Sequence, residues 1–347
     1  MTFSAWQSGK EVSQSVHMNT SPHSVGETLQ SIKNGFETVI SSCSKMPAAI
    51  SMGFPGPCDY KLGIVGNLPN FPDFNGELAL GPYLEEKFKL PVIIENDGNL
   101  FTLGEYSQGY LPYVNGMLES HGNPKRYKNL IGVTIGTGFG CGIVINGTIL
   151  SGDNNSGGEI WNTASSLHPG ECAEAYVGGR YLSMIYNGLA GNPVDKNVEP
   201  VDLYAIACNN ESENKHIARQ AFSIMGAAIG DAIANCLSII DGLVVIGGGI
   251  AAAYDLFIDA ALRELNGSLN HKNGIEVRRI AHPCYNFDHV ESRKLFLADE
   301  HKEINIPGSS KNIRIKTNHN TAVGRSRLDT SKAICLGAFL KAEELLA

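Results

Sequence analysis

Asp97 lies in the part of this chain whose residue types and spacing most clearly point to chemistry. The apolar segment 92–94 has strand character, and it ends at Glu95-Asn96-Asp97 before a Gly-Asn turn. A parallel strand is buried on both faces, so its carboxyl end is where an α/β sheet can present a carboxylate to a ligand. The segment alone is equally compatible with a structural role, in which Asp97 caps a helix that begins near Asn99.

A glycine-rich segment follows a second predicted strand. Residues 131–135 form this strand, which runs into Gly136-Thr137-Gly138-Phe139-Gly140-Cys141-Gly142. Two further strands are predicted at 143–145 and 148–150, and Asn146-Gly147 between them is the strongest short signal for a hairpin. A strand, a glycine-rich turn and a hairpin are therefore contiguous in the chain.

The elements before Asp97 alternate between helix and strand. Ser24 and Glu27 have the spacing of a capping box, and apolar residues recur at helical intervals over 25–40. Segment 48–52 is predicted to be the next strand, and it leads into the loop Gly53-Phe54-Pro55-Gly56-Pro57. Glycine lets a backbone approach another backbone or a ligand closely, but the loop taken alone is better explained as a tight turn.

The second half of the chain repeats this alternation. A long helix is predicted over 217–240, then a strand at 243–246, the segment Gly247-Gly248-Gly249, and a helix over 251–265. Small residues recur every four positions in the long helix, which permits close helix packing. The charged residues Asp231 and Arg219 exclude a membrane-spanning role for it.

Composition excludes several classes of protein. The chain has 347 residues, of which 43% are hydrophobic and 18% charged, as in a folded globular enzyme. No apolar stretch is long enough for a membrane helix, and the polar start lacks the regions of a signal peptide, so a cytoplasmic protein is expected. The net charge of −8 argues against nucleic acid as a partner. The eight scattered cysteines are expected to be reduced apolar residues.

Two polar segments, 115–129 and 301–332, interrupt the alternation. The second is rich in Lys, Arg, Asn and Ser. Both are predicted to be solvated loops, and a nucleic-acid role for the second is the weaker interpretation.

Six motifs together resemble the ROK family of sugar kinases and repressors, in order and spacing. They are Gly53-Phe54-Pro55-Gly56-Pro57-Cys58-Asp59, Glu95-Asn96-Asp97, residues 136–142, Gly158-Glu159-Ile160, Cys172-Ala173-Glu174-Ala175-Tyr176, and Ile246-Gly247-Gly248-Gly249. The resemblance implies the actin-like, ribonuclease-H-like ATPase fold, in which two α/β domains flank a cleft. It also implies ATP-dependent phosphorylation of a hexose or N-acetylhexosamine, and a homodimer. The expected domains are residues 1–106 with 330–347, and residues 107–329.

The same resemblance implies roles for individual residues. Asp97 would be the base that accepts the proton of a sugar hydroxyl. The implied sugar contacts are Asn67, Asn96, Asp97, Glu159 and Glu174, with Asn162 where the family has a further contact. Gly136, Thr137 and Gly138 would present backbone N–H groups to the phosphates of ATP, and Gly247, Gly248 and Gly249 would leave room for the adenosine. Mg²⁺ would accompany ATP.

The chain departs from the family pattern in three ways. Family kinases begin with an Asp-x-Gly-Gly-Thr loop that holds phosphates, and this sequence has none. Either the chain starts after that loop or it has lost half of the phosphate site, so little kinase activity and an exposed strand edge are expected for the chain as given. The family's zinc ligands are reduced to Cys172, with Trp161-Asn162 in place of a Gly-His pair and His168 as a lone neighbour, so zinc is not expected. Segment 301–332 is also longer than in the family.

Two alternatives to a kinase stay open at this point. One is a sugar-responsive regulatory protein related to the family's repressors, and the missing phosphate loop favours it. The absence of a DNA-binding helix-turn-helix from the sequence opposes it. The other is a scaffold with a vestigial cleft.

Overall fold

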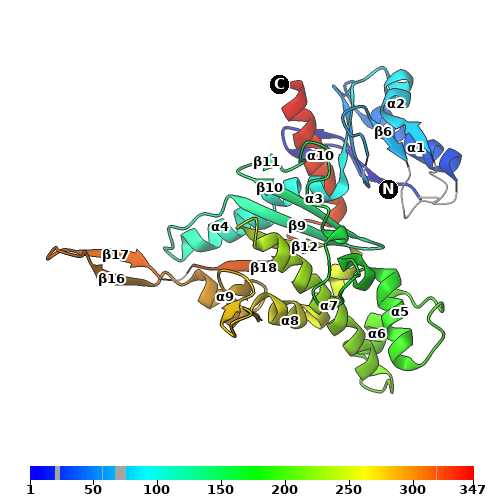
Figure 1. Ribbon diagram of the computed structural model, residues 1–347. Coiled ribbons are helices and arrows are strands. Elements are labelled where there is room, and N and C mark those ends of the chain that lie inside the picture. Colours follow the sequence, from blue (N-terminus) through cyan, green and yellow to red (C-terminus); the bar gives the residue numbers. More distant parts are fainter. Residues whose placement is uncertain (20–23, 57, 67–75, 318) are drawn as a thin grey trace. The chain divides into compact units, whose positions relative to one another are not determined.

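The chain divides into two compact units. The structure is a computed structural model that describes residues 1–19, 24–56, 58–66, 76–317 and 319–347 (Figure 1). Unit 1 comprises Met1–Gly109, Gly140–Glu159 and Arg327–Ala347, and unit 2 comprises Tyr110–Phe139 and Ile160–Ser326.

Unit 1 is built around a parallel strand pair that leads into the Asp97 region. Its elements are β1 (Thr2–Phe3), β2 (Trp6–Gln7), β3 (Lys10–Glu11), β4 (Val16–His17), α1 (Val25–Ser42), β5 (Ile50–Phe54), β6 (Ile64–Gly66), β7 (Glu77–Ala79), α2 (Leu80–Phe88), β8 (Val92–Asn96), α3 (Asp97–Ser107), β10 (Phe139–Ile145), β11 (Thr148–Ile149) and α10 (Thr330–Leu346). Strands β5 and β8 run parallel, with Phe54 opposite Asn96, and α3 packs against α10. Among the described residues β5 has no strand partner other than β8.

Two local predictions for unit 1 are confirmed. The Ser24 side chain accepts a hydrogen bond from the Glu27 N–H at the start of α1, as the capping box predicts. Asn146 and Gly147 join β10 to β11 with φ values of 50° and 90°, the left-handed conformation that a tight hairpin turn requires.

The hairpin β10–β11 belongs to unit 1 because it packs on α3. A Cβ at Gly142 of β10 would collide with the carbonyl oxygen of Gly98 in α3. The sequence-based bounds had placed residues 140–159 in the second domain. Those bounds follow from the family resemblance alone, and a hairpin carries no local signal of which unit it will contact.

Unit 2 contains a parallel sheet with strand order β9-β12-β18-β15. Its elements are α4 (Tyr110–Ser120), β9 (Asn129–Ile135), η1 (Ile160–Asn162), η2 (Ala173–Tyr176), α5 (Gly179–Ala190), α6 (Pro200–Cys208), α7 (Lys215–Leu237), β12 (Leu243–Gly247), η3 (Gly249–Ala253), α8 (Tyr254–Leu265), β13 (Ser268–Asn270), β14 (Glu276–Arg278), β15 (Cys284–Asn286), α9 (Val290–Leu297), β16 (His301–Asn305), β17 (Asn312–Lys316) and β18 (Thr321–Arg325). The small residues of α7 face α8, since a Cβ at Gly226 or Gly230 would collide with α8 carbonyls. Close helix packing was the predicted role of that stripe.

The prediction of solvated loops at 115–129 and 301–332 is wrong in part. Helix α4 covers the start of the first segment, and its buried apolar residues continue a helical pattern that begins before residue 115. The second segment contains β18, an inner strand of the sheet in which Ala322 and Val323 are fully buried. Its flanks are polar because they form hydrogen bonds inside the protein: Tyr127 donates to the Asn320 carbonyl, for example, at 2.6 Å.

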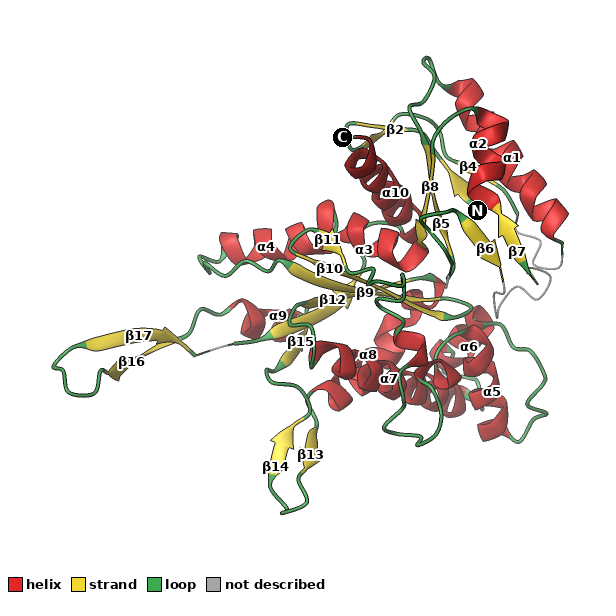
Figure 2. Cartoon of the chain, turned by 45° about the horizontal axis from the view of Figure 1, so that its top comes forward, coloured by secondary structure: helices red, strands yellow, loops and turns green. Residues whose placement is uncertain are grey.

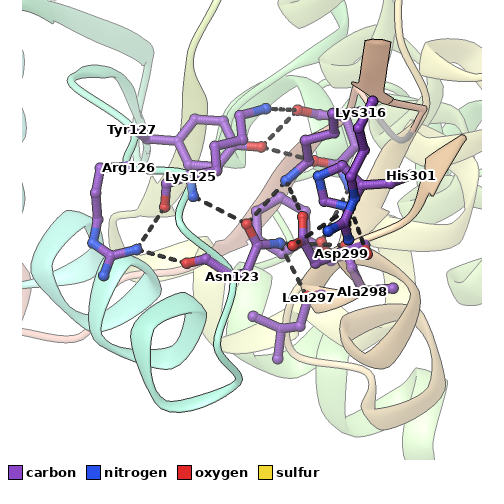
Figure 3. A network of polar contacts seen from close by, with 12 residues as sticks. Asn123, Lys125, Arg126, Tyr127, Leu297, Ala298, Asp299, His301 and Lys316 are labelled. Carbon is purple, nitrogen blue, oxygen red and sulfur yellow. Dashed lines mark hydrogen bonds and ion pairs between the residues drawn. The ribbon is translucent and has the colours of Figure 1, made fainter. Parts of the chain in front are cut away.

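The rest of segment 301–332 includes an antiparallel hairpin, β16–β17, which projects from the sheet of unit 2 (Figure 2). Its base is fixed by the polar network of Figure 3. Asn123 Oδ1 accepts a hydrogen bond from Lys316 Nζ at 2.9 Å, while Asn123 Nδ2 donates to the Leu297 carbonyl at 3.1 Å. Lys316 Nζ also lies 3.1 Å from Asp299 Oδ1.

Neither unit shows a membrane-spanning element in its described residues, where no helix is both long and apolar enough to cross a bilayer. All eight cysteines are free thiols, and Cys141 and Cys284 are buried.

Candidate functional site

The polar residues that follow β8 have distinct structural roles. Asn96 is the N-cap of α3, and its Oδ1 accepts a hydrogen bond from the Asn99 N–H at 3.1 Å. The sequence left open whether Asp97 serves as the helix cap. In the structure the cap of α3 is Asn96 and not Asp97. Asp97 is the first residue of the helix, and its Oδ1 accepts from the Gly98 N–H at 2.9 Å. Burial raises the pKa of the Asp97 carboxyl, because an ionised group loses hydration there.

Tyr60 and Cys58 complete the surroundings of Asp97. Asn96 Nδ2 donates to the Tyr60 hydroxyl at 3.2 Å, so both ends of the Asn96 amide are held by the protein. Burial raises the pKa values of Cys58 and Tyr60, and the negative charges of Asp97 and Glu159 raise them further. Burial is the larger cause and raises the pKa of the Cys58 thiol to about 11, so this cysteine is neutral near pH 7.

Sequence reasoning missed Tyr60 and Cys58 as members of this site. Both lie at the end of the first glycine motif, beside Asp59. The start of that motif, in β5, approaches Asp97 closely, since a Cβ at Gly53 would lie 3.3 Å from the Asp97 Cα. The position of Tyr60, directly after a motif already singled out, was the one available signal. Asn67 lies outside the described residues.

The glycine segments after β9 and β12 lie at one edge of the unit 2 sheet. Strands β9 and β12 run parallel with Gly247 opposite Thr134, so their carboxyl ends adjoin. Gly248 has a φ of 91° and packs on the Ile135 backbone. A Cβ at Gly136 or at Gly249 would meet no atom within 4 Å, so the space beside both is open.

The loop 136–138 is held in place by backbone contacts with residues 178 and 179. The Gly136 carbonyl accepts a hydrogen bond from the Gly179 N–H at 2.9 Å, and a Cβ at Gly178 would lie 2.7 Å from the Thr137 carbonyl oxygen. The Gly136 N–H donates to the Gly138 carbonyl at 3.1 Å. Thr137 is exposed at the tip of this loop. Open, side-chain-free backbone at the ends of parallel strands is suited to contact with phosphates.

Two other implied sugar contacts, Asn162 and Glu174, also belong to unit 2. Asn162 ends η1 and is exposed, whereas Glu174 lies in η2. Glu174 Oε2 accepts a hydrogen bond from the Phe139 N–H at 2.9 Å, directly after the 136–138 loop. The structure therefore joins Glu174 to the segment implied in phosphate binding, within one unit.

The segment implied in zinc binding shows no metal cluster. Among the described residues no three His, Cys, Asp or Glu side chains are grouped closely enough to hold a metal ion. Cys172 precedes η2, and the His168 ring stacks on the Tyr176 ring with 3.7 Å between their centroids.

Comparison with known proteins identifies the family. The ROK family model matches residues 1–286. The chain is similar to the glucokinase of Halalkalibacterium halodurans, with 29% identity over 60% of this chain and 63% of that protein. It is also similar to the N-acetyl-D-glucosamine kinase of Vibrio cholerae, with 28% identity over 60% of this chain and 68% of that protein. The match thus spans less than two thirds of the Halalkalibacterium relative.

Solved structures agree with this result. The structure of glucokinase from Parabacteroides distasonis has 36% identity and a TM-score of 0.82, covering 99% of this chain and 94% of that chain. A ROK family glucokinase from Streptomyces griseus, in complex with glucose and AMPPNP, has 20% identity and a TM-score of 0.62, covering 96% of this chain and 92% of that chain. The expected fold class, an α/β protein with the actin-like ATPase fold, is confirmed. The chain belongs to the ROK family.

Proposed function

We propose that this protein is an ATP-dependent carbohydrate kinase that phosphorylates a hexose or an N-acetylhexosamine. The observation that carries the proposal is the state of Asp97. Its carboxylate lies at the end of a parallel strand, is not needed as the helix cap, and has a raised pKa. A carboxylate whose pKa is raised accepts a proton more readily, as a general base requires.

The proposed reaction transfers the γ-phosphoryl group of ATP to a sugar hydroxyl. Asp97 accepts the hydroxyl proton while the oxygen attacks phosphorus, and ADP leaves. In unit 1, Asn96 and Glu159 are proposed to hold neighbouring hydroxyls, and the Tyr60 hydrogen bond keeps the Asn96 amide oriented. In unit 2, Asn162 and Glu174 are proposed as sugar contacts, and Asn67 is added from the motif alone.

ATP is proposed to bind at the open edge of the unit 2 sheet. Backbone of Gly136, Thr137 and Gly138 would contact phosphates, and Gly247 to Gly249 would border the adenosine, because a Cβ at Gly136 or at Gly249 would meet no atom within 4 Å. Mg²⁺ would arrive bound to the ATP phosphates, since it keeps several waters and few protein ligands, and would neutralise their charge during transfer. No protein ligand is assigned to it.

The names of the relatives support the proposed substrate class. They include glucokinases and N-acetyl-D-glucosamine kinases. The proposal includes a cytoplasmic location, where ATP is available, and a homodimer, which light scattering on the purified protein would measure.

A regulatory protein without kinase activity is the second candidate. One relative, the xylose repressor of Caldicellulosiruptor bescii, is 25% identical over 66% of this chain. Such a protein would bind sugar and transfer no phosphate.

Calorimetric titration with a panel of hexoses and N-acetylhexosamines, combined with a coupled assay of ADP release, tests the proposal. Glu159→Ala is the matched variant. Kinase activity predicts that at least one sugar both binds and stimulates ADP release, and the assignment of Glu159 to the sugar predicts that Glu159→Ala binds that sugar more weakly. Equal binding by wild type and Glu159→Ala would remove Glu159 from the sugar site. Binding without ADP release would support the regulatory alternative.

A further inference from the structure

Asp231 is a buried carboxylate in the middle of α7 that the proposed reaction does not use. It is 2% exposed, in a helix whose neighbouring positions are small or apolar. It lies 3.0 Å from the Arg279 guanidinium, which also donates to Asn235 Oδ1 at 2.7 Å. Burying a carboxylate costs free energy unless the group is paired and hydrogen-bonded. Asp231 is therefore expected to depend on its partners, of which Arg279 is one.

The other partner of Asp231 is Ser166, which lies 65 residues earlier in the chain. The Ser166 N–H donates to Asp231 Oδ2 at 2.8 Å, and its hydroxyl donates to Asp231 Oδ1 at 2.5 Å. Both carboxylate oxygens are thus bound to one residue of one loop. Hydrogen bonds to a charged acceptor are stronger than neutral ones, so this attachment is firm.

Ser166 lies at the turn of a short closed loop. The Ala173 N–H donates to the Thr163 carbonyl at 2.9 Å, and the Ser165 N–H donates to the Glu171 carbonyl at 2.9 Å. Ala164 and Cys172 form an isolated antiparallel bridge between these bonds. The segment 163–173 is therefore a small hairpin whose two ends are held together and whose turn is attached to α7.

The residues directly outside this hairpin are the two implied sugar contacts of unit 2. Asn162 precedes Thr163, and Glu174 follows Ala173. The short helices that carry them, η1 and η2, also contact one another and α7. Fixing the turn of the hairpin to Asp231 therefore fixes the position of both contacts at once.

We propose that Asp231, paired with Arg279, is a positioning residue that sets the placement of Asn162 and Glu174 for sugar binding. It touches neither substrate and acts through Ser166 and the 163–173 hairpin. This inference rests on the proposed function, because it assigns those two residues to the sugar.

The variants are Asp231→Asn and Ser166→Ala, with Arg279→Lys as the conservative change. Asp231→Asn keeps the side-chain shape but replaces one acceptor oxygen by a donor. Ser166→Ala removes the hydroxyl alone, at an exposed position, and so tests the inference even if Asp231→Asn fails to fold. Asp259→Asn is the matched control, an exposed carboxylate on the neighbouring helix α8.

For Asp231→Asn we expect a rise in sugar KM of about tenfold, a clearly smaller change in ATP KM, and faster hydrogen exchange of the amides over 160–176. Ser166→Ala should change the same three quantities by a smaller amount. Arg279→Lys should have a sugar KM close to that of wild type, and Asp259→Asn should match wild type in all three. The fluorescence of Trp161, next to Asn162, reports on the same segment.

Three results would overturn the inference: unchanged exchange over 160–176 in both Asp231→Asn and Ser166→Ala, unchanged sugar KM in both, or equal rises in the two KM values. Failure of the proposed function is a different result, since wild type would then release no ADP with any sugar. The exchange measurement decides whether Asp231 holds the hairpin in that case too.

Discussion

Replacing Asp97 by Asn separates its proposed chemical role from its structural one. The Asn side chain has nearly the same shape, and its oxygen can still accept the hydrogen bond that Gly98 donates at 2.9 Å. The cap of α3 is unaffected because Asn96 supplies it. What is lost is the ability to accept a proton. Loss of a general base lowers a rate by about 10² to 10⁴-fold, so kcat should fall by that factor while sugar binding changes little.

The same substitution has a predicted effect on stability. The pKa of Asp97 is raised in the folded protein, so the folded state binds this proton more tightly than the unfolded state does. The charged carboxylate therefore costs stability above the raised pKa, and this cost disappears below the unfolded value of about 3.9. Asp97→Asn should have a higher Tm than wild type near pH 7, with a difference that vanishes as the pH falls below that value.

The assay combines kcat, sugar affinity by calorimetry, and Tm at a series of pH values. The control is Asp153→Asn, an exposed carboxylate of unit 1 that should behave as wild type. Full turnover by Asp97→Asn would remove Asp97 from the role of base. A lower Tm than wild type at pH 7 would contradict the desolvation that underlies its raised pKa.

Three further substitutions test individual contacts. Tyr60→Phe removes the hydroxyl that accepts from Asn96 Nδ2 and orients its amide, so sugar KM should rise, and leaving that donor without its partner should lower the free energy of unfolding by about 1–3 kcal/mol in a urea titration. Gly142→Ala should lower the free energy of unfolding by about 1–3 kcal/mol in a urea titration, because its Cβ would collide with the Gly98 carbonyl; an unchanged midpoint would contradict the packing of β10 on α3. Asn123→Ala should increase hydrogen exchange in β16–β17, whose base it holds, and equal protection in wild type and variant would refute that role.

The strand that ends at Asp97 could be predicted from sequence because its signals are local. An apolar run followed by polar residues and a glycine marks β8 and the start of α3. Which residue caps α3 could not be predicted, because Asn96 and Asp97 are adjacent and both residue types cap helices well. The two possible caps differ by one position in the chain. The structure identifies the cap as Asn96, because the Asn99 N–H donates to its side chain.

Strand β18 and the role of Asp231 depended on contacts distant in sequence. Strand β18 has a short apolar stretch between polar flanks, which is typical of a loop, yet it is buried between β12 and β15. Asp231 interrupted an apolar helix and served only to exclude a membrane span. Its partners Ser166 and Arg279 lie 65 and 48 residues away, and no local pattern links them.

The most direct test of the central claim is to detect the product. The protein expressed from its complete gene is incubated with MgATP and each sugar of the panel, and the reaction is analysed by mass spectrometry. The proposed kinase activity predicts a sugar monophosphate from at least one hexose or N-acetylhexosamine, formed in parallel with ADP and greatly diminished in Asp97→Asn. If wild-type protein binds a sugar by calorimetry but forms no sugar phosphate from it, the protein is not a kinase for that sugar and the proposed activity is wrong.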